Sequence, residues 1–316
     1  MKQLRLATIG EYDGYQEQSL LPLLIARLGY RIVWVKPAEC DLLIIGKHIN
    51  LVKWLLKQGS LRSFPDFRTW LPETFVSNRQ YQPVTLFHTC ENLRHDSVET
   101  DYAITFDIAP DRQSHFRFPY WMEMIDWSHE GITGNRNIRF GRLYSIERMQ
   151  QPLGTTFLSK PRKAALFASH LDGPRKQFYL ALGKAVQVDG FGRYFDTSIR
   201  SHSKSGFFKY DILRSYAFNL CPENKLQPGY YTEKIPEAFL ADTLPISWSD
   251  HHISIDFNPE AFVNLAGIDW QNPDALRNIF ENELILRAYA AEPLLLQRPS
   301  IEPLLRFVGT ILEHTR

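Results

Sequence analysis

The strongest constraint on the fold of this chain is an alternation of short β-rich runs with amphipathic helical patterns. In the first part of the chain, one helical pattern lies at 16–28. The β-rich runs around and after it are LRLATI (4–9), RIVWV (31–35), DLLIIG (41–46), PVTLFHTC (83–90) and DYAITFD (101–107). A strand, a helix and another strand in this order indicate a right-handed parallel crossover. An open α/β sheet is therefore predicted.

A second series of runs begins after the Gly- and Pro-spaced stretch QQPLGTTFLSKPRK at 150–163, where we expect a domain boundary. Its members are AALFAS (164–169), AVQVDG (185–190), AFNLCP (217–222) and LPISW (244–248). A chain of 316 residues is about twice the usual domain size. We therefore expect α/β domains at 1–155 and 156–271, with a cleft between them.

The tail at 272–316 contains two further helix candidates, the first opened by Asn272 and Pro273 in cap and first-turn positions. These C-terminal helices can pack back on the N-terminal domain.

Composition excludes several classes of protein. Hydrophobic residues make up 44% of the chain and charged residues 22%, as in an ordinary soluble protein. A net charge of +1 gives no general field for nucleic acid. No uncharged apolar stretch reaches the ~18 residues of a membrane span. The three widely spaced cysteines, Cys40, Cys90 and Cys221, suggest neither a disulfide framework nor a zinc site, so a reducing cytoplasm is expected.

The stretch from Cys221 to Trp248 concentrates polar chemistry on one strand-to-helix connection. Thr232 is predicted to cap the helix TEKIPEAFLAD, with Ile235 and Phe239 on one face. Lys234 in the first turn favours a bound anion, and the Glu233 carboxylate suits a ribose diol. Together with two adjacent tyrosines, this pattern indicates a nucleotide site.

An alternative reading of the same stretch remains open. Glu233 would then only satisfy the helix dipole, Lys234 would be a solvated surface residue, and the two tyrosines would be half-buried packing groups.

The segments NLCPEN and GYYTEKIPEAFLADTLPISW together resemble the donor-binding signature of glycosyltransferase family ten, the α-1,3/4-fucosyltransferases. DFNPEAFVNL (256–265), VDGFGRYFD (188–196) and FHTCENLRHD (87–96) are similar to further blocks of that family. The resemblance covers roughly residues 83–270. It implies two Rossmann-like domains facing a cleft, the glycosyltransferase-B architecture.

The resemblance also implies roles for individual residues. Glu91 would be the general base that deprotonates the acceptor hydroxyl. Arg193 and Lys234 would clamp the diphosphate of GDP-fucose, and Glu233 would hold its ribose. Asn224 and Tyr230 would complete the donor pocket, and the other residues in family-like positions nearby are Ser169, Arg175 and Lys209.

The expected chemistry needs no metal and no cofactor. Departing diphosphate charge must be stabilised, and without an Asp-x-Asp metal site two cations would supply that stabilisation. Proton removal from the acceptor suits the Glu91 carboxylate. The alternative is that Glu91 only pairs with Arg94, and His88 and His95 are rival bases.

The sequence departs from the family pattern near the donor. Pro222 replaces the Phe of Phe-Glu-Asn, Ser249 replaces a Gly, and His170 replaces an Asn. The identity of the sugar is therefore less constrained than nucleotide binding.

The expected function is inverting transfer of L-fucose from GDP-fucose to a glycan hydroxyl, O3 of N-acetylglucosamine. The alternatives are transfer of another GDP-linked sugar, and a catalytically lapsed sugar-nucleotide or glycan-binding relative. The expected acceptor is an oligosaccharide or lipid-linked glycan. A cytoplasmic location is expected, without a transmembrane segment or nucleic-acid partner and with peripheral association at the inner face of the membrane left open.

Overall fold

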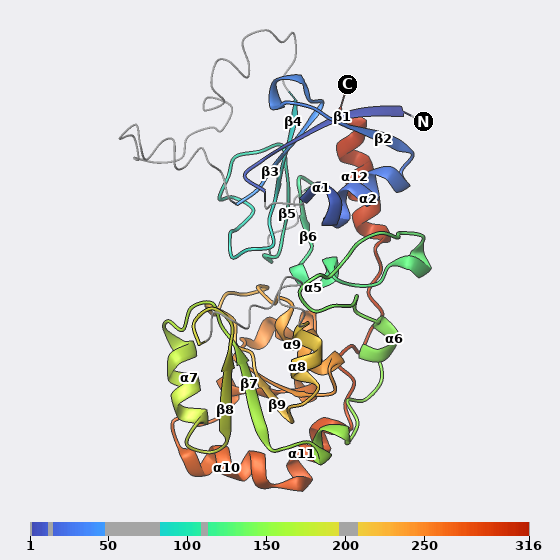
Figure 1. The fold of residues 1–316 in the computed structure, drawn as a ribbon. Coiled ribbons are helices and arrows are strands. Elements are labelled where there is room, and N and C mark those ends of the chain that lie inside the picture. The colour runs from blue at the N-terminus through green and yellow to red at the C-terminus, as the bar shows by residue number, and fades with distance from the viewer. Residues whose placement is uncertain (1, 12–14, 48–82, 109–112, 196–207, 316) are drawn as a thin grey trace, which may run out of the picture. The chain divides into compact units, whose positions relative to one another are not determined.

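The computed structural model describes residues 2–11, 15–47, 83–108, 113–195 and 208–315. Two compact units are present, each with its own parallel sheet (Figure 1). Unit 1 consists of Met1–Glu123, Trp127–Asn135 and Ser300–Arg316, and unit 2 consists of Met124–Asp126 and Arg136–Pro299. The predicted α/β class is confirmed. The division at 155 and 271 and the cleft stay predictions.

The sheet of unit 1 has the strand order β2-β1-β3-β4-β5-β6, and every neighbouring pair is parallel. Its strands are β1 (Lys2–Ile9), β2 (Tyr30–Trp34), β3 (Leu42–Ile45), β4 (Val84–His88), β5 (Tyr102–Thr105) and β6 (His115–Arg117). Its helices are α1 (Tyr15–Gln18), α2 (Leu20–Arg27), α5 (Tyr120–Glu123) and α12 (Glu302–Glu313). All the carboxyl ends of these strands therefore meet at one edge.

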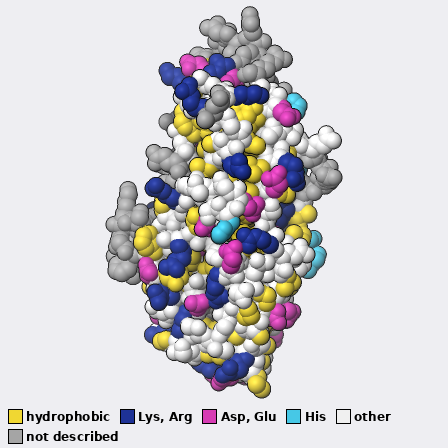
Figure 2. All heavy atoms as spheres, turned by 90° about the vertical axis from the view of Figure 1, so that its right-hand side faces the viewer, with side chains coloured by type: hydrophobic (Ala, Val, Ile, Leu, Met, Phe, Trp, Pro, Cys, Tyr) yellow, Lys and Arg dark blue, Asp and Glu magenta, His cyan; other side chains and the backbone are white. Residues whose placement is uncertain are grey.

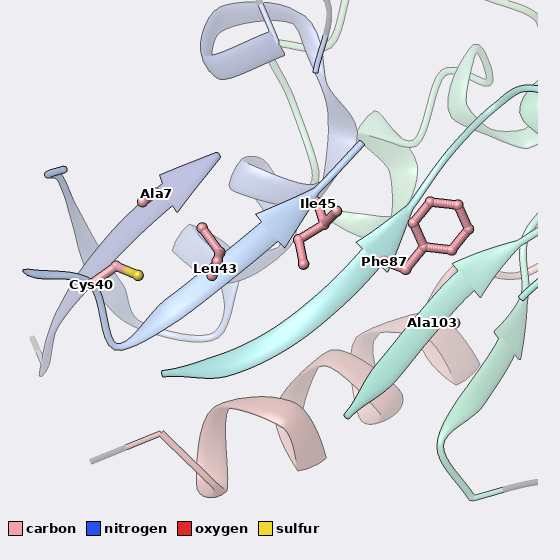
Figure 3. Packing of buried hydrophobic residues seen from close by; sticks show 6 residues of the cluster. All are labelled: Ala7, Cys40, Leu43, Ile45, Phe87 and Ala103. Atoms are coloured by element: carbon pink, nitrogen blue, oxygen red, sulfur yellow. The ribbon is translucent and has the colours of Figure 1, made fainter. Parts of the chain in front are cut away.

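Burial explains why β3 reads as a continuous apolar run. All four of its residues are buried, as expected for a parallel strand covered on both faces. One of the clusters they join spans neighbouring strands β1, β3, β4 and β5 (Figure 3). Its members are Ala7, Cys40, Leu43, Ile45, Phe87 and Ala103. The last helix, α12, contacts α2 and so belongs to this unit (Figure 1).

The sheet of unit 2 has the order β11-β10-β9-β7-β8 and is also parallel throughout. Its strands are β7 (Lys163–Phe167), β8 (Gln187–Phe191), β9 (Phe218–Leu220), β10 (Leu244–Ser247) and β11 (Val263–Asn264). Its helices are α6 (Ile146–Met149), α7 (Pro174–Leu182), α8 (Lys209–Leu213), α9 (Lys234–Leu240), α10 (Pro273–Glu281) and α11 (Glu283–Ala290).

The strands predicted from the sequence are confirmed, and the short β6 and β11 were not foreseen. The start of α10 is also as predicted, because Asn272 accepts a hydrogen bond from the Asp274 backbone N–H and Pro273 occupies the first turn.

No helix within the described ranges combines the length and apolarity that crossing a bilayer requires. On the face drawn in Figure 2, basic and acidic side chains are interspersed.

Candidate functional site

The residues predicted to bind the donor lie in unit 2, and several of them follow the carboxyl ends of its strands. Ser169 follows β7, Arg193 follows β8 and Asn224 follows β9, and all three side chains are exposed. Such an edge is where ligands of open α/β sheets bind. The fold thus brings loops that are far apart in sequence to one side of a single sheet.

A glycine shapes the turn that carries Arg193. Gly192 has a φ of 93°, which side chains with a Cβ rarely adopt. A Cβ at Gly192 would also lie 2.8 Å from the carbonyl oxygen of Ala168. That same oxygen accepts a hydrogen bond of 3.1 Å from the Tyr194 backbone N–H. Arg193 is therefore held on a tight turn against the end of β7.

Lys234 is the centre of a buried hydrogen-bonded group. Its Nζ lies 2.6 Å from Glu223 Oε2 and 2.7 Å from Thr232 Oγ1, and only 14% of its side chain is exposed. Glu223 Oε1 also accepts hydrogen bonds from the Thr232 backbone N–H at 2.9 Å and hydroxyl at 2.6 Å. Glu223 thereby ties the end of β9 to the start of α9.

The prediction that Thr232 caps α9 was wrong. The helix begins at Lys234, Glu233 occupies the cap position, and no side chain provides the cap hydrogen bond. The reason is the buried Glu223 carboxylate, which takes the Thr232 hydroxyl as a donor. Ile235 and Phe239 are both buried, as predicted.

Charges around Lys234 reinforce one another. Burial alone lowers the pKa of the Lys234 ammonium, but the carboxylates of Glu223 and Glu233 raise it above its usual value. Burial alone raises the pKa of the Glu233 carboxyl, yet the Lys234 and Lys209 ammonium groups hold it at about 2. Glu233 Oε1 lies 3.8 Å from Lys234 Nζ. Both side chains are therefore charged at neutral pH. Because only 14% of the Lys234 side chain is exposed, Lys234 is not the solvated surface residue of the alternative reading.

Lys209 forms a second buried ion pair in the same unit. Its Nζ lies 2.5 Å from Glu237 Oε2, and Tyr144 donates a 3.1 Å hydrogen bond to Glu237 Oε1. Burial raises the pKa of the Glu237 carboxyl, and Lys209 acts in the opposite direction. Sequence patterns had not pointed to Glu237 or to the pairing role of Glu223. Both partners become visible only when α8, β9 and α9 are assembled.

Arg175 and Tyr230 complete the set of predicted donor residues. Arg175, in the first turn of α7, donates to the carbonyl oxygens of Pro222 at 3.4 Å and His170 at 3.3 Å, and its charge acts on Lys234. Arg175 thus lies against the same loop as Glu223. The Tyr230 side chain is buried at 4% exposure.

Glu91 lies in unit 1, on the loop that follows β4. Its side chain is 44% exposed, and its Oε1 lies 2.8 Å from Lys47 Nζ, on the neighbouring loop after β3. Its backbone N–H donates to Thr89 Oγ1 at 3.1 Å. The predicted pairing of Glu91 with Arg94 is replaced by the pairing with Lys47, since Arg94 bonds Asp96 at 3.3 Å.

The two rival bases are hydrogen-bonded, His88 through both ring nitrogens and His95 through Nδ1, while His95 Nε2 is buried without a partner among the described residues. His88 lies between the Tyr15 hydroxyl, 2.8 Å from Nδ1, and Glu123 Oε1, 2.9 Å from Nε2. His95 Nδ1 lies 2.5 Å from Asp107 Oδ2. Both histidines are buried, whereas Glu91 is open to solvent.

Two family profiles match this chain. "Glycosyltransferase family 10 (fucosyltransferase) C-term" matches residues 157–282, and "Alpha-(1,3)-fucosyltransferase FucT N-terminal domain" matches residues 63–124. The alpha-(1,3)-fucosyltransferase FucT of Helicobacter pylori is 29% identical over 260 residues, which are 72% of this chain. The chain spans about half of that relative, 53% of its length.

Solved structures share the fold. A crystal structure of alpha1,3-fucosyltransferase has a TM-score of 0.70 at 23% identity, covering 99% of this chain and 90% of that one. A crystal structure of alpha1,3-fucosyltransferase with GDP-fucose has a TM-score of 0.67 at 22% identity, covering 99% and 91%.

The low pKa of Glu233 leads to a prediction about acid stability. A carboxyl whose pKa falls from 4.5 to about 2 on folding contributes stability that is present above pH 4.5 and is lost as the pH falls toward 2. Glu233→Gln should therefore lower the free energy of unfolding by about 2 to 3 kcal/mol at pH 6, with the difference shrinking toward zero near pH 2. Denaturant titrations between these limits measure it. Glu281→Gln, at an exposed residue of α10, is the control and should show no such trend.

Proposed function

Because the chain belongs to glycosyltransferase family 10, we propose that it transfers L-fucose from GDP-fucose to O3 of N-acetylglucosamine in a glycan, with inversion at the anomeric carbon. One observation carries the proposal: the basic side chains of Arg175 and Lys209 lie within electrostatic reach of the Glu233-Lys234 pair at the carboxyl edge of the unit 2 sheet. Such a group suits a ligand with both a diphosphate and a ribose.

Lys234 and Arg193 are the proposed diphosphate ligands. An ammonium group has three donors, and within the described residues Lys234 uses two, toward Glu223 and Thr232. The third donor can bind a phosphate oxygen. Arg193 is exposed on its turn and brings a guanidinium group that matches phosphate geometry. Their charges would stabilise the negative charge that develops on departing GDP.

Glu233 is the proposed ribose ligand. Its carboxylate is ionised at neutral pH and 24% exposed, so two oxygens can accept hydrogen bonds from a vicinal diol. Exposed Asn224 and Ser169 are proposed to bind the outer part of the donor.

Glu91 is the proposed general base. In this mechanism the acceptor hydroxyl gives its proton to Glu91 while its oxygen attacks the anomeric carbon and the bond to GDP breaks. The exposure of the carboxylate supports this role, since an acceptor hydroxyl can reach it. Lys47 and Thr89 hold the loop in place.

Removal of the base should slow transfer without weakening donor binding. Glu91→Gln keeps the shape of the side chain, so turnover should fall by roughly 10² to 10⁴ while GDP affinity changes by no more than a few-fold. Lys47→Gln breaks the same ion pair and leaves the carboxylate in place, so it should retain most of the turnover. If the two variants lost equal activity, the ion pair and not the base would explain the effect.

Substitutions of Lys234 and of Glu233 should affect different kinetic constants. Lys234→Met removes a contact that strengthens as GDP departs, so kcat/KM should fall by about 2 to 4 kcal/mol with a large share in kcat. Glu233→Ala removes a contact made before and during transfer, so it should mainly raise KM. Lys225→Met, at an exposed lysine of the same loop, should change neither constant.

Calorimetric titration with GDP-fucose, GDP-mannose and UDP-galactose accompanies these kinetics. Preference of the wild-type protein for UDP-galactose over both GDP-sugars would refute the proposed donor. Normal kinetics in both Lys234→Met and Glu233→Ala would indicate that Lys234 and Glu233 have only a structural role.

A further inference from the structure

A second group of chemically reactive side chains lies in unit 1, at the carboxyl edge of its sheet. Glu11 follows β1, His88 is the last residue of β4, Cys90 lies on the loop after it, and Glu123 ends α5. Only 6% of the His88 side chain and 4% of the Glu123 side chain are exposed. Cys90 and Glu11 are partly buried beside them. Burying a histidine and a carboxyl in such a group is costly unless something balances them.

Two of these side chains converge on the same atom. His88 Nε2 lies 2.9 Å and Cys90 Sγ 3.1 Å from Glu123 Oε1. One ligand atom from each of the three residues lies within 4.8 Å of the other two. The arrangement therefore gathers an imidazole nitrogen, a sulfur and a carboxylate oxygen around one small volume.

Glu11 brings a carboxyl group with one unpartnered oxygen. Its Oε1 is buried and has no hydrogen-bond partner among the residues that the structure describes. The group packs so closely on Gly46 that a Cβ there would lie 2.4 Å from Glu11 Cδ. Burial raises the pKa of Glu11 to about 7, and its charge acts on both His88 and Cys90. Glu11 thus lies within electrostatic reach of the other three residues, outside the group whose ligand atoms all lie within 4.8 Å of one another.

We propose that His88, Cys90 and Glu123, joined by Glu11 when the ion binds, form a binding site for one divalent transition-metal ion of the zinc type. Zinc takes four ligands of these kinds. His88, Cys90 and Glu123 supply three of them, and the Glu11 side chain would move toward them to supply the fourth. Thiolate and imidazole select against Mg²⁺ and Ca²⁺, which prefer all-oxygen sites.

Tyr15 occupies the position expected of an outer-shell partner. Its hydroxyl lies 2.8 Å from His88 Nδ1, the ring nitrogen opposite the one that faces Glu123. A metal-bound histidine usually donates its other N–H to such a group, which fixes the ring orientation. A hydroxyl both donates and accepts, so Tyr15 can bond Nδ1 in either tautomer of His88.

The protonation states of these side chains are compatible with binding of an ion. Without an ion, His88 Nε2 and Cys90 Sγ can each present a proton to Glu123 Oε1. On binding, the protons of the Cys90 thiol, of His88 Nε2 and of a protonated Glu11 carboxyl are released to solvent. His88 then binds through Nε2 as the neutral ring, with its remaining proton on Nδ1 toward Tyr15. Ligand atoms around tetrahedral zinc lie about 3.3 to 3.7 Å apart, so the present contacts need to open by roughly half an ångström.

The other histidine-acid group of unit 1 makes a weaker case and serves as a control. Asp107 already accepts hydrogen bonds from the His95 backbone N–H at 3.1 Å and from Thr105, and it contacts His95 Nδ1. His115 Nε2 lies 2.9 Å from the Thr105 hydroxyl. Both carboxylate oxygens of Asp107 have partners, and no sulfur of a described residue joins this group, although His95 Nε2 is buried without a partner there.

The test uses the full chain, stripped with EDTA, dialysed and titrated with Co²⁺ and Zn²⁺. The expected result is about one Zn²⁺ per chain by elemental analysis and, with Co²⁺, a thiolate-to-metal charge-transfer absorption. Cys90→Ser keeps a hydroxyl that can donate to Glu123 but removes the sulfur. It should abolish the charge-transfer band and weaken Zn²⁺ binding by at least about tenfold.

Two further variants keep the test decisive. Glu11→Gln should weaken Zn²⁺ binding while leaving the charge-transfer band, and it stands in if Cys90→Ser fails to fold. His115→Asn alters only the other group and should leave both readouts unchanged. Absence of tight Zn²⁺ or Co²⁺ binding, wild-type binding in Cys90→Ser and Glu11→Gln, or loss of binding in His115→Asn alone would overturn the site. Because the readout is metal content, its outcome is independent of whether the chain transfers fucose.

Discussion

The buried ammonium of Lys234 is the interaction on which the rest of the proposed donor site depends. A buried charge is tolerated only when paired and hydrogen-bonded, and Lys234 is held by Glu223, Thr232 and Glu233. The same contacts join the end of β9 to the start of α9. One ion-pair group therefore fixes the loop and keeps both members of the Glu-Lys pair charged.

Parallel sheets explain why each unit gathers its polar chemistry at one edge. All strands of a sheet end on the same side, so the loops after them meet there. In unit 2 this edge carries cations balanced by carboxylates. In unit 1 it carries the exposed Glu91 and a histidine-thiol-carboxyl group, beside which Glu11 Oε1 has no partner among the described residues. The first arrangement suits an anionic donor and the second suits a metal cation.

Much of the fold could be predicted because its signals are local. Buried parallel strands appear as apolar runs, and the cap of α10 needs only Asn272 and Pro273. The cap of α9 was predicted wrongly because the Thr232 hydroxyl is bound by Glu223, a partner that only the assembled sheet brings near. The group around Cys90 could not be predicted from the sequence for a similar reason. Its members are spread from residue 11 to residue 123, and cysteine spacing alone gave no hint of a metal site.

The most direct test of the central claim is a transfer reaction with GDP-fucose and N-acetyllactosamine, with the product analysed by mass spectrometry and NMR. The account predicts a trisaccharide with fucose α-linked to O3 of N-acetylglucosamine, the configuration that inversion of β-linked GDP-fucose gives. Tight binding of GDP-fucose without any transfer or hydrolysis would instead identify a lapsed sugar-nucleotide-binding relative. Transfer from GDP-mannose or UDP-galactose in place of GDP-fucose would contradict the proposed donor.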